Sequence, residues 1–171
     1  MNKFEKKPVA AVLGVVAVVT ILFILAHSLQ TVENSWGESN VIAALFEPVL
    51  RRAYGFALRV STWMGHPIAL AYGSFVRKLA HFFEYFALGV ECVAVTVYLA
   101  GKAVTPYIWA DLFVVLMVAV IDEFVQSFVG RTSLVADVLL DFSGAVAGII
   151  LALLVAAAIF ALKAPRRECA R

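Results

Sequence analysis

Four apolar stretches, each of twenty residues or more, constrain the fold of this chain more than any other feature. They are residues 8–28, 79–100, 106–128 and 134–162. Roughly 20 helical residues are needed to cross the hydrocarbon core of a bilayer. We therefore predict an all-α membrane protein with four transmembrane helices, which together form a single domain over residues 1–171.

The composition agrees with this prediction. Hydrophobic residues make up 63% of the chain and charged residues 15%, whereas a soluble domain is nearer 45–50% apolar and about 25% charged. This composition excludes a disordered chain and argues against a soluble enzyme. The formal net charge of +2 is too small to indicate a nucleic-acid partner, and the two cysteines predict no disulfide framework.

The first apolar stretch could be a transmembrane helix or a cleaved signal peptide, because Lys3, Lys6 and Lys7 precede it. It is longer than the usual apolar region of a signal peptide, and no A-x-A cleavage site closes it. We therefore predict a retained helix.

A different kind of segment lies between the first two predicted helices. Residues 40–72 contain an approximate helical stripe of apolar residues, but Glu47, Arg51, Arg52 and Arg59 interrupt it. These charges are too frequent for a lipid-exposed span. We predict an amphipathic segment that lies at the interface or re-enters the membrane.

The flanking basic residues predict the orientation. With four helices both termini lie on one side, which then holds eight Lys and Arg residues against six on the other. The long first loop counts least in the positive-inside rule. We therefore place both termini in the cytoplasm of a multi-pass protein of the cell membrane.

Seven acidic residues fall inside the predicted spans: Glu84, Glu91, Asp111, Asp122, Glu123, Asp137 and Asp141. At about 2.5–3.5 kcal/mol for each such residue at the bilayer centre, seven unpaired acids would cost on the order of 20 kcal/mol. They must therefore be paired, protonated, near the interface or in a wet cavity. Five of them fall in the outer half of the membrane, together with four basic partners: Arg77, Lys78, His81 and Arg131.

Helical periodicity places these residues on shared faces. His81, Glu84 and Glu91 share one face of the second predicted helix, and Asp137 and Asp141 share a face of the fourth. Gly144 and Gly148 lie on that same face, and their spacing allows another helix to approach closely. Three polar faces, one from each of the last three helices, can then meet in one cavity that opens outward.

The motifs in this region resemble those of the VanZ-like membrane proteins. Residues 78–89 read K-L-A-H-F-F-E-Y-F-A-L-G and are similar to the family's K-x-x-H-F-x-E-Y-x-x-L-G signature. A second signature, D-E-x-x-Q followed by G-R and D, is matched by residues 122–126, 130–131 and 137. The chain departs from the family pattern at Val129, where proline is usual, and at Asp141, where asparagine is frequent. The resemblance implies a bacterial membrane protein, and the family's namesake lowers susceptibility to teicoplanin, a lipoglycopeptide that acts outside the cell.

The combined pattern predicts a ligand-binding pocket in the outer half of the membrane. Its residues are Lys78, His81, Glu84, Tyr85, Asp122, Glu123, Gln126, Arg131, Ser133 and Asp137. We expect it to engage an amphiphile of the envelope: a lipid-linked cell-wall precursor, another anionic membrane lipid, or the acyl portion of the antibiotic. The pattern assigns no cofactor and no oligomeric state.

Four other interpretations remain open from the sequence. The chain could be a membrane-embedded hydrolase or transferase, whose candidate catalytic residues are His81, Glu84, Asp122, Glu123 and Asp137. The pocket could hold a metal, for which the candidate ligands are His81, Glu84 and Glu123. It could be only a network of ion pairs that joins the helix ends, or part of a polar path through a transporter or channel.

Overall fold

The structure of the protein is a computed structural model that describes residues 3–29, 32–64, 71–129 and 134–163. It contains five α-helices: α1 (Lys3–Ser28), α2 (Val32–Trp63), α3 (Tyr72–Ala100), α4 (Ile108–Phe128) and α5 (Val135–Leu162). Two short 3-10 helices, η1 (Gly101–Ala103) and η2 (Thr105–Tyr107), connect α3 to α4. The described residues form no strand, so the predicted all-α class is confirmed for them.

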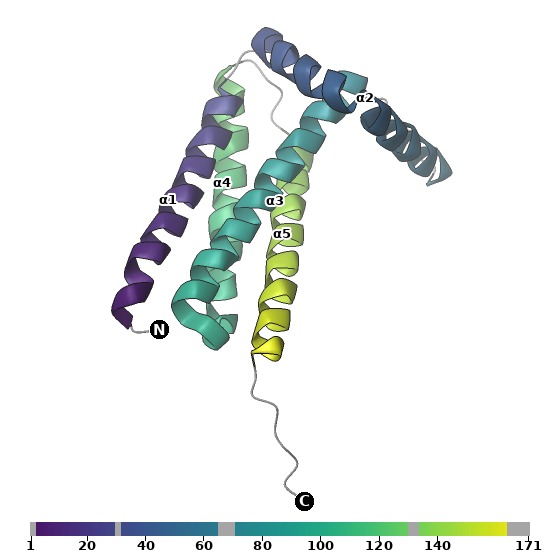
Figure 1. The fold of residues 1–171 in the computed structure, drawn as a ribbon. Helices are drawn as coiled ribbons and strands as arrows, with labels where there is room; N and C mark the ends of the chain where they lie inside the picture. Colours follow the sequence, from purple (N-terminus) through teal and green to yellow (C-terminus); the bar gives the residue numbers. More distant parts are fainter. Residues whose placement is uncertain (1–2, 30–31, 65–70, 130–133, 164–171) are drawn as a thin grey trace, which may run out of the picture.

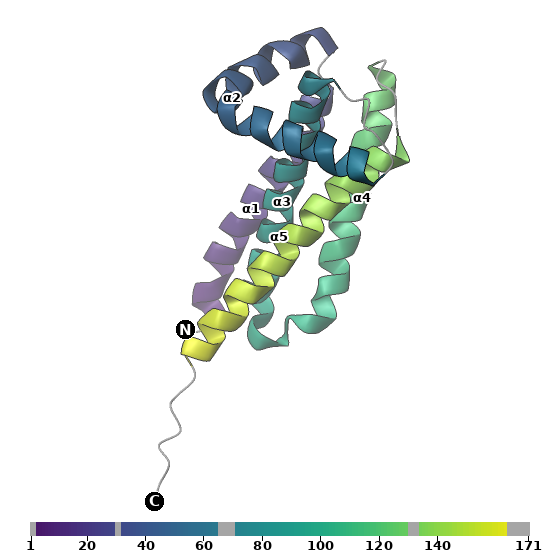
Figure 2. The ribbon, with the colours of Figure 1, turned by 90° about the vertical axis from the view of Figure 1, so that its right-hand side faces the viewer.

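Four of the helices run side by side, and α2 lies across one end of the bundle that they form (Figure 1, Figure 2). The start of α1 and the end of α5 lie together at the opposite end (Figure 1). Between α1 and α3, residues 32–63 thus form one long helix, whose bounds differ from those of the segment of residues 40–72 that we expected, and α3 begins at Tyr72 rather than near residue 79. Figure 2 shows a bend in the middle of α2, where Pro48 lies inside the helix. A proline at such a position lacks an N–H and clashes with the preceding turn, which bends the helix.

Three helices are long and apolar enough to cross a membrane: Pro8–Ser28 of α1, all of α3 and all of α5. The fourth expected span, α4, has 21 residues and includes Asp111, Asp122 and Glu123. Because these three acids lie within 13 residues of one another, the composition of α4 alone does not identify it as a membrane span. In the fold, these three side chains are buried against the other helices.

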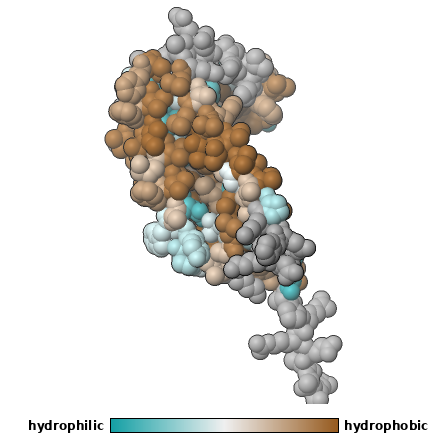
Figure 3. Space-filling model, turned by 90° about the vertical axis from the view of Figure 1, so that its left-hand side faces the viewer, coloured by the Kyte–Doolittle hydropathy of each residue, from teal (hydrophilic) through white to brown (hydrophobic). Residues whose placement is uncertain are grey.

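The lateral surface of the bundle is hydrophobic. Large apolar residues of α1 such as Val12, Val15 and Leu22 are at least 60% exposed, and hydrophobic residues cover most of the described part of this face between its ends (Figure 3). Such an extended apolar surface would aggregate in water but is suited to contact with lipid tails.

Glycines hold α3 and α5 close together. A Cβ atom on Gly144 would lie 2.3 Å from the carbonyl oxygen of Phe82, and one on Gly148 would lie 2.1 Å from that of Phe86. On α3, a Cβ on Gly89 would lie 2.2 Å from the carbonyl oxygen of Ala145. The close approach predicted from the Gly144-x-x-x-Gly148 spacing is therefore confirmed, and its partner is α3.

The hydrophobic core lies inside the four-helix bundle, next to the end that α2 covers. Residues from α1, α3, α4 and α5 form it: Ile24, Tyr85, Leu88, Val93, Val115, Val118, Ala119, Ala145 and Ile149. This packing fixes the relative positions of the four helices and hence of the polar residues one or two turns nearer to α2.

Candidate ligand-binding site

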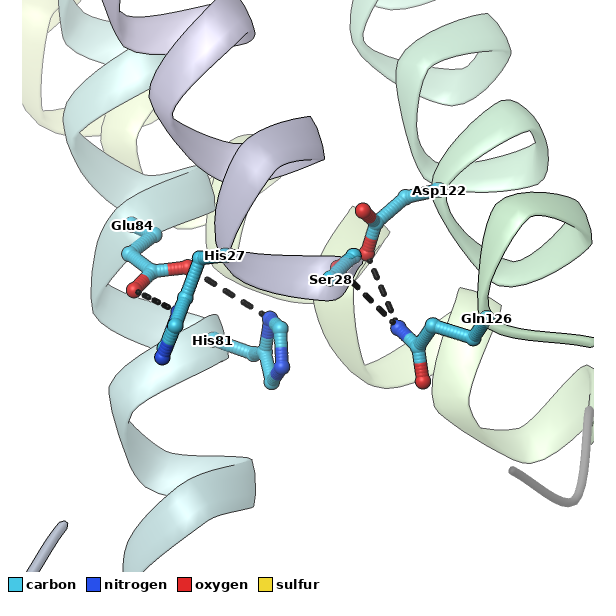
Figure 4. Close-up of polar contacts among 6 residues, drawn as sticks. All are labelled: His27, Ser28, His81, Glu84, Asp122 and Gln126. Atoms are coloured by element: carbon cyan, nitrogen blue, oxygen red, sulfur yellow. Dashed lines mark hydrogen bonds and ion pairs between the residues drawn. The ribbon is translucent and has the colours of Figure 1, made fainter. Parts of the chain in front are cut away.

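A glutamate on α3 joins two histidines. Glu84 Oε1 lies 3.1 Å from Nδ1 of His27 on α1, at hydrogen-bonding distance, and Glu84 Oε2 lies 3.4 Å from Nδ1 of His81, one turn earlier on α3. Figure 4 shows both imidazoles beside the carboxylate. The two rings are also stacked, with their centroids 5.7 Å apart. Glu84 thus links α1 to α3 through a charged acceptor, which forms stronger hydrogen bonds than a neutral one.

A second link joins α4 to α1. The Gln126 amide donates to Asp122 Oδ2 at 3.1 Å, one turn away on α4, and to the Ser28 hydroxyl at 3.4 Å (Figure 4). Asp122 and Ser28 are fully buried. The end of α1 is therefore held by polar contacts from both α3 and α4.

The beginning of α5 is held by two further contacts. Lys78 on α3 forms an ion pair with Asp137 in the first turn of α5. Glu123 on α4 accepts a hydrogen bond at 2.7 Å from the backbone N–H of Leu134, the residue that precedes α5. A carboxylate at a helix N-terminus satisfies an otherwise free backbone donor and interacts favourably with the helix dipole.

Three buried side chains from three helices converge between these links. One ligand atom each of His81, Asp122 and Asp141 lies within 4.8 Å of the other two. The candidate metal ligands from the sequence were His81, Glu84 and Glu123, whereas the set that meets in the described residues pairs His81 with two aspartates from α4 and α5.

Several polar atoms in this region have no hydrogen-bond partner in the structure. They include Tyr85 Oη, Asp122 Oδ1 and Glu123 Oε2. Most buried polar groups in proteins are paired, so a group of unpaired ones requires an explanation such as an ion or a proton. A small cavity of about 20 Å³ lies in this region, and its lining includes Glu123 together with His81 and Asp141. Its volume suits a single water molecule or ion, so it is too small for an organic headgroup.

We refer to Lys78, His81, Glu84, Asp122, Glu123, Gln126, Asp137 and Asp141 together as the polar cluster. A much larger apolar groove lies beside this cluster. It has a volume of about 590 Å³ and lies between α1, α2 and α3. Its walls are mainly apolar, with three polar residues among them: His27, Arg77 and Glu84. Tyr54 of α2 packs against Tyr72 and Phe75 of α3, which holds α2 over this side of the bundle.

The two deeper acids each have a threonine partner. Thr20 on α1 donates to Glu91 at 3.0 Å, and Thr96 donates to Asp111 at 2.9 Å. These contacts join α1 to α3 and α3 to α4, so both acids serve helix packing. The sequence could not identify these partners because it does not show which helices are neighbours.

The structure brings together most of the residues predicted for the pocket. Those at the end covered by α2 are Lys78, His81, Glu84, Tyr85, Asp122, Glu123, Gln126 and Asp137. Arg131 and Ser133 lie outside the described residues. The predicted list of pocket residues left out His27 and Asp141, although helical periodicity places Asp141 on the same polar helix face as Asp137, one turn away.

Together, the lipid-compatible surface and the polar cluster inside one end of the bundle define a helical membrane protein with an internal polar site. The family comparison is consistent with this class. The chain belongs to the VanZ/LLP1 family, whose model matches residues 12–156. It is thus a VanZ-like membrane protein, of a family associated with glycopeptide resistance. Comparisons with curated proteins and with solved structures find no match.

Proposed function

We propose that this protein binds an acylated amphiphile of the bacterial cell envelope, and that this binding lowers susceptibility to teicoplanin-type lipoglycopeptides. The observation that carries the proposal is the groove of about 590 Å³ between α1, α2 and α3. Small-molecule sites in proteins have volumes of about 300–1,000 Å³, with mainly apolar walls and a few polar groups. An acyl chain matches the apolar walls of this groove.

The polar residues of the groove suit the other end of such a ligand. Arg77 is partly exposed and lines both the groove and the small polar cavity. A guanidinium binds a phosphate or carboxylate through two parallel hydrogen bonds. We therefore place an anionic headgroup at Arg77, at the edge of the polar cluster rather than inside it, because the cavity within the cluster is too small. The ligand is a membrane lipid or a lipid-linked wall precursor.

The proposal includes a topology in which α4 is a fourth transmembrane helix. Its acids face the bundle, while Phe113, Ile121 and Phe124 face outward and are more than 40% exposed. A helix with this distribution presents an apolar face to lipid despite its acidic residues. With four spans and the bias of basic residues, both termini are cytoplasmic and the polar cluster faces outward.

In this topology α2 lies on the outer surface of the membrane. Leu45, Phe46, Val49 and Phe56 of α2 are more than half exposed, and Arg51 and other arginines of the same helix are also exposed. Exposed apolar residues next to arginines are typical of a helix that lies in the interface of an anionic membrane. The groove beneath α2 would then open at the depth where headgroups meet acyl chains.

A substitution that fills the groove tests the proposal. Ala80 lines the groove, and Ala80→Trp would occupy part of its volume. Ala158→Trp on the exposed surface of α5 is the matched control. Both would be compared with wild type and empty vector at equal membrane expression, by teicoplanin susceptibility in a sensitive host and by native mass spectrometry of detergent-purified protein.

We expect wild type and Ala158→Trp to protect the host and to retain a lipid, and Ala80→Trp to lose both properties. Equal protection by Ala80→Trp would show that the groove is not the working site. Wild-type protein that carries no lipid in any of several lipid mixtures would overturn the proposed ligand.

A further inference from the structure

We propose that His81, Asp122 and Asp141 bind one divalent transition-metal cation between α3, α4 and α5. This inference goes beyond the proposed function and does not depend on the groove. It starts from the convergence of one donor atom from each side chain within 4.8 Å of the other two. Imidazole and carboxylate together are a donor set that Zn²⁺ and related cations favour.

The surroundings of His81 fit a metal ligand. Its Nδ1 lies 3.4 Å from Glu84 Oε2, an ion-pair distance at which neither atom has a hydrogen bond, and its Nε2 is the other nitrogen open to a cation. A carboxylate behind the imidazole is the usual arrangement around metal-bound histidines, because it fixes the tautomer and raises the basicity of the ligating nitrogen. Glu84 is itself oriented by His27 at 3.1 Å. The carboxylate beside His81 is therefore oriented by a second histidine.

The unpaired oxygens provide the second, independent observation. Asp122 is fully buried, and while its Oδ2 accepts from Gln126, its Oδ1 has no partner. Glu123, which lines the adjoining cavity of about 20 Å³, likewise has one unpaired oxygen. A buried carboxylate oxygen without a donor is costly. A cation between His81, Asp122 and Asp141 would offset this cost for Asp122, and the cavity, which His81 and Asp141 also line, lies beside that point.

The charge balance at this end of the bundle points the same way. Among the described residues, five carboxyl groups gather here: Glu84, Asp122, Glu123, Asp137 and Asp141. Within the described ranges, the permanent cations near them include Arg77 and Lys78, and Lys78 is already paired with Asp137. An excess of carboxylates in an apolar setting requires a counter-charge.

The donors must move closer when the cation binds. Zn²⁺ holds its ligands at about 2.0–2.2 Å in a tetrahedral arrangement, which puts neighbouring donor atoms about 3.4 Å apart. Because the donor atoms lie no more than 4.8 Å apart, each must shift by about 1 Å or less, within the reach of side-chain rotation. A cation held in this way would tie α4 and α5 to α3.

Metal content of the purified full-length chain tests the proposal. The protein would be prepared in detergent with a cleaved, histidine-free affinity tag, stripped with a chelator, loaded with Zn²⁺ or Mn²⁺ and desalted. Asp141→Asn removes a ligand with almost no change in shape. Asp111→Asn is the matched control, because Asp111 is also buried in the bundle but pairs with Thr96 away from the cluster.

We expect one metal ion per chain in wild type and in Asp111→Asn, and a loss of the ion in Asp141→Asn. Inductively coupled plasma mass spectrometry measures this metal content. Loading with Co²⁺ would add a visible absorption band that Asp141→Asn lacks. Glu84→Gln keeps all three ligands but removes the carboxylate beside His81. It should weaken metal affinity by about 10–100-fold, the usual effect of replacing a residue that orients a metal ligand.

Two outcomes would overturn the proposal. One is wild-type protein that retains no metal after loading, which would indicate that protons neutralise the acids. The other is Asp141→Asn that retains as much metal as wild type. If Asp141→Asn is not monodisperse on size exclusion, His81→Gln replaces it, with the same expected loss.

Discussion

The ion pair between Lys78 and Asp137 joins the beginnings of α3 and α5, and both side chains are about three-quarters buried. Glu47 and Arg51 form a comparable pair on α2, but both of its side chains are about half exposed or more. The hydrogen bond to Glu47 and the charge of its carboxylate raise the pKa of Arg51 above its usual value. Burial, rather than the presence of opposite charges, decides what each pair contributes to stability.

We therefore expect Lys78→Met and Asp137→Asn to destabilise the bundle individually and to be less than additive when combined. Their coupling energy should be about 1 kcal/mol, because partial exposure screens the pair and reduces the larger value of a fully buried one. A double-mutant cycle on unfolding in detergent measures this coupling. The matched cycle on Glu47 and Arg51 should show no measurable coupling, and equal coupling in the two cycles would contradict the argument.

The residues of the polar cluster were partly predictable from the sequence. Helical periodicity places His81 and Glu84 on one face, because both lie on the same helix and their spacing determines the angle between them. The role of His27 was not predictable, since nothing local indicates that the end of α1 packs beside α3. Asp141 was predictable as a member of the polar face of Asp137, but its neighbours on α3 and α4 depend on how the helices pack.

Among the elements, α3 and α5 are in the closest contact, and glycine is what permits it. Two backbone carbonyl oxygens of α3, those of Phe82 and Phe86, occupy the places that side chains on Gly144 and Gly148 would need. Backbone cannot move aside as a flexible side chain can. The helix pair must therefore separate if either glycine gains a side chain.

We expect Gly144→Ala to lower the free energy of unfolding by about 1–3 kcal/mol, the usual cost of overpacking, although alanine favours a helix. Gly14→Ala on α1 is the control, because nothing lies within 4 Å of the added Cβ. It should leave stability unchanged or slightly higher. Unfolding in detergent by increasing SDS would compare the two, and equal stabilities would contradict the close contact.

The helix boundaries show where sequence reasoning succeeds and where it fails. The end of α3 at Ala100 and both ends of α5 lie within one residue of the expected ranges, because apolar runs there stop at polar or charged residues. The beginning of α3 was missed by seven residues, since Arg77 and Lys78 interrupt hydrophobicity without interrupting the helix. The beginning of α2 was missed by eight residues, because its first turns are polar.

The depth of α2 in the membrane can be tested from two of its exposed side chains. Phe56 and Arg52 are both exposed on this helix, and an interfacial helix buries its apolar side chains and keeps its charges in water. A fluorescent label on Phe56→Cys should be quenched by brominated lipid tails more strongly than the same label on Arg52→Cys. Similar weak quenching of both labels would place α2 away from the membrane.

At the scale of the whole molecule, the described helices form a bundle whose two ends differ. One end holds the polar cluster and the covering helix α2, and the other holds the start of α1 and the end of α5 (Figure 1). A site at one end of a membrane protein is accessible from one side only. The orientation of the bundle therefore decides whether the groove and the cluster can meet a molecule outside the cell.

The ends of α4 provide the most direct test of that orientation. Thr105 lies before this helix and Ser127 lies in its last turn, and both are exposed. In a variant without Cys92 and Cys169, we expect a membrane-impermeant maleimide to label Ser127→Cys on spheroplasts. Thr105→Cys should be labelled only after permeabilisation, because we place that end of α4 in the cytoplasm.

The pattern of labelling separates the possible errors. Labelling of Thr105→Cys alone would show that the orientation is opposite to the proposed one. The polar cluster would then face the cytoplasm, where it could not meet a lipoglycopeptide. Labelling of both positions before permeabilisation, or of neither, would mean that α4 does not cross the membrane. Its buried acids would then line a three-span bundle, and the outward-facing groove would have to be reconsidered together with the resistance that we attribute to it.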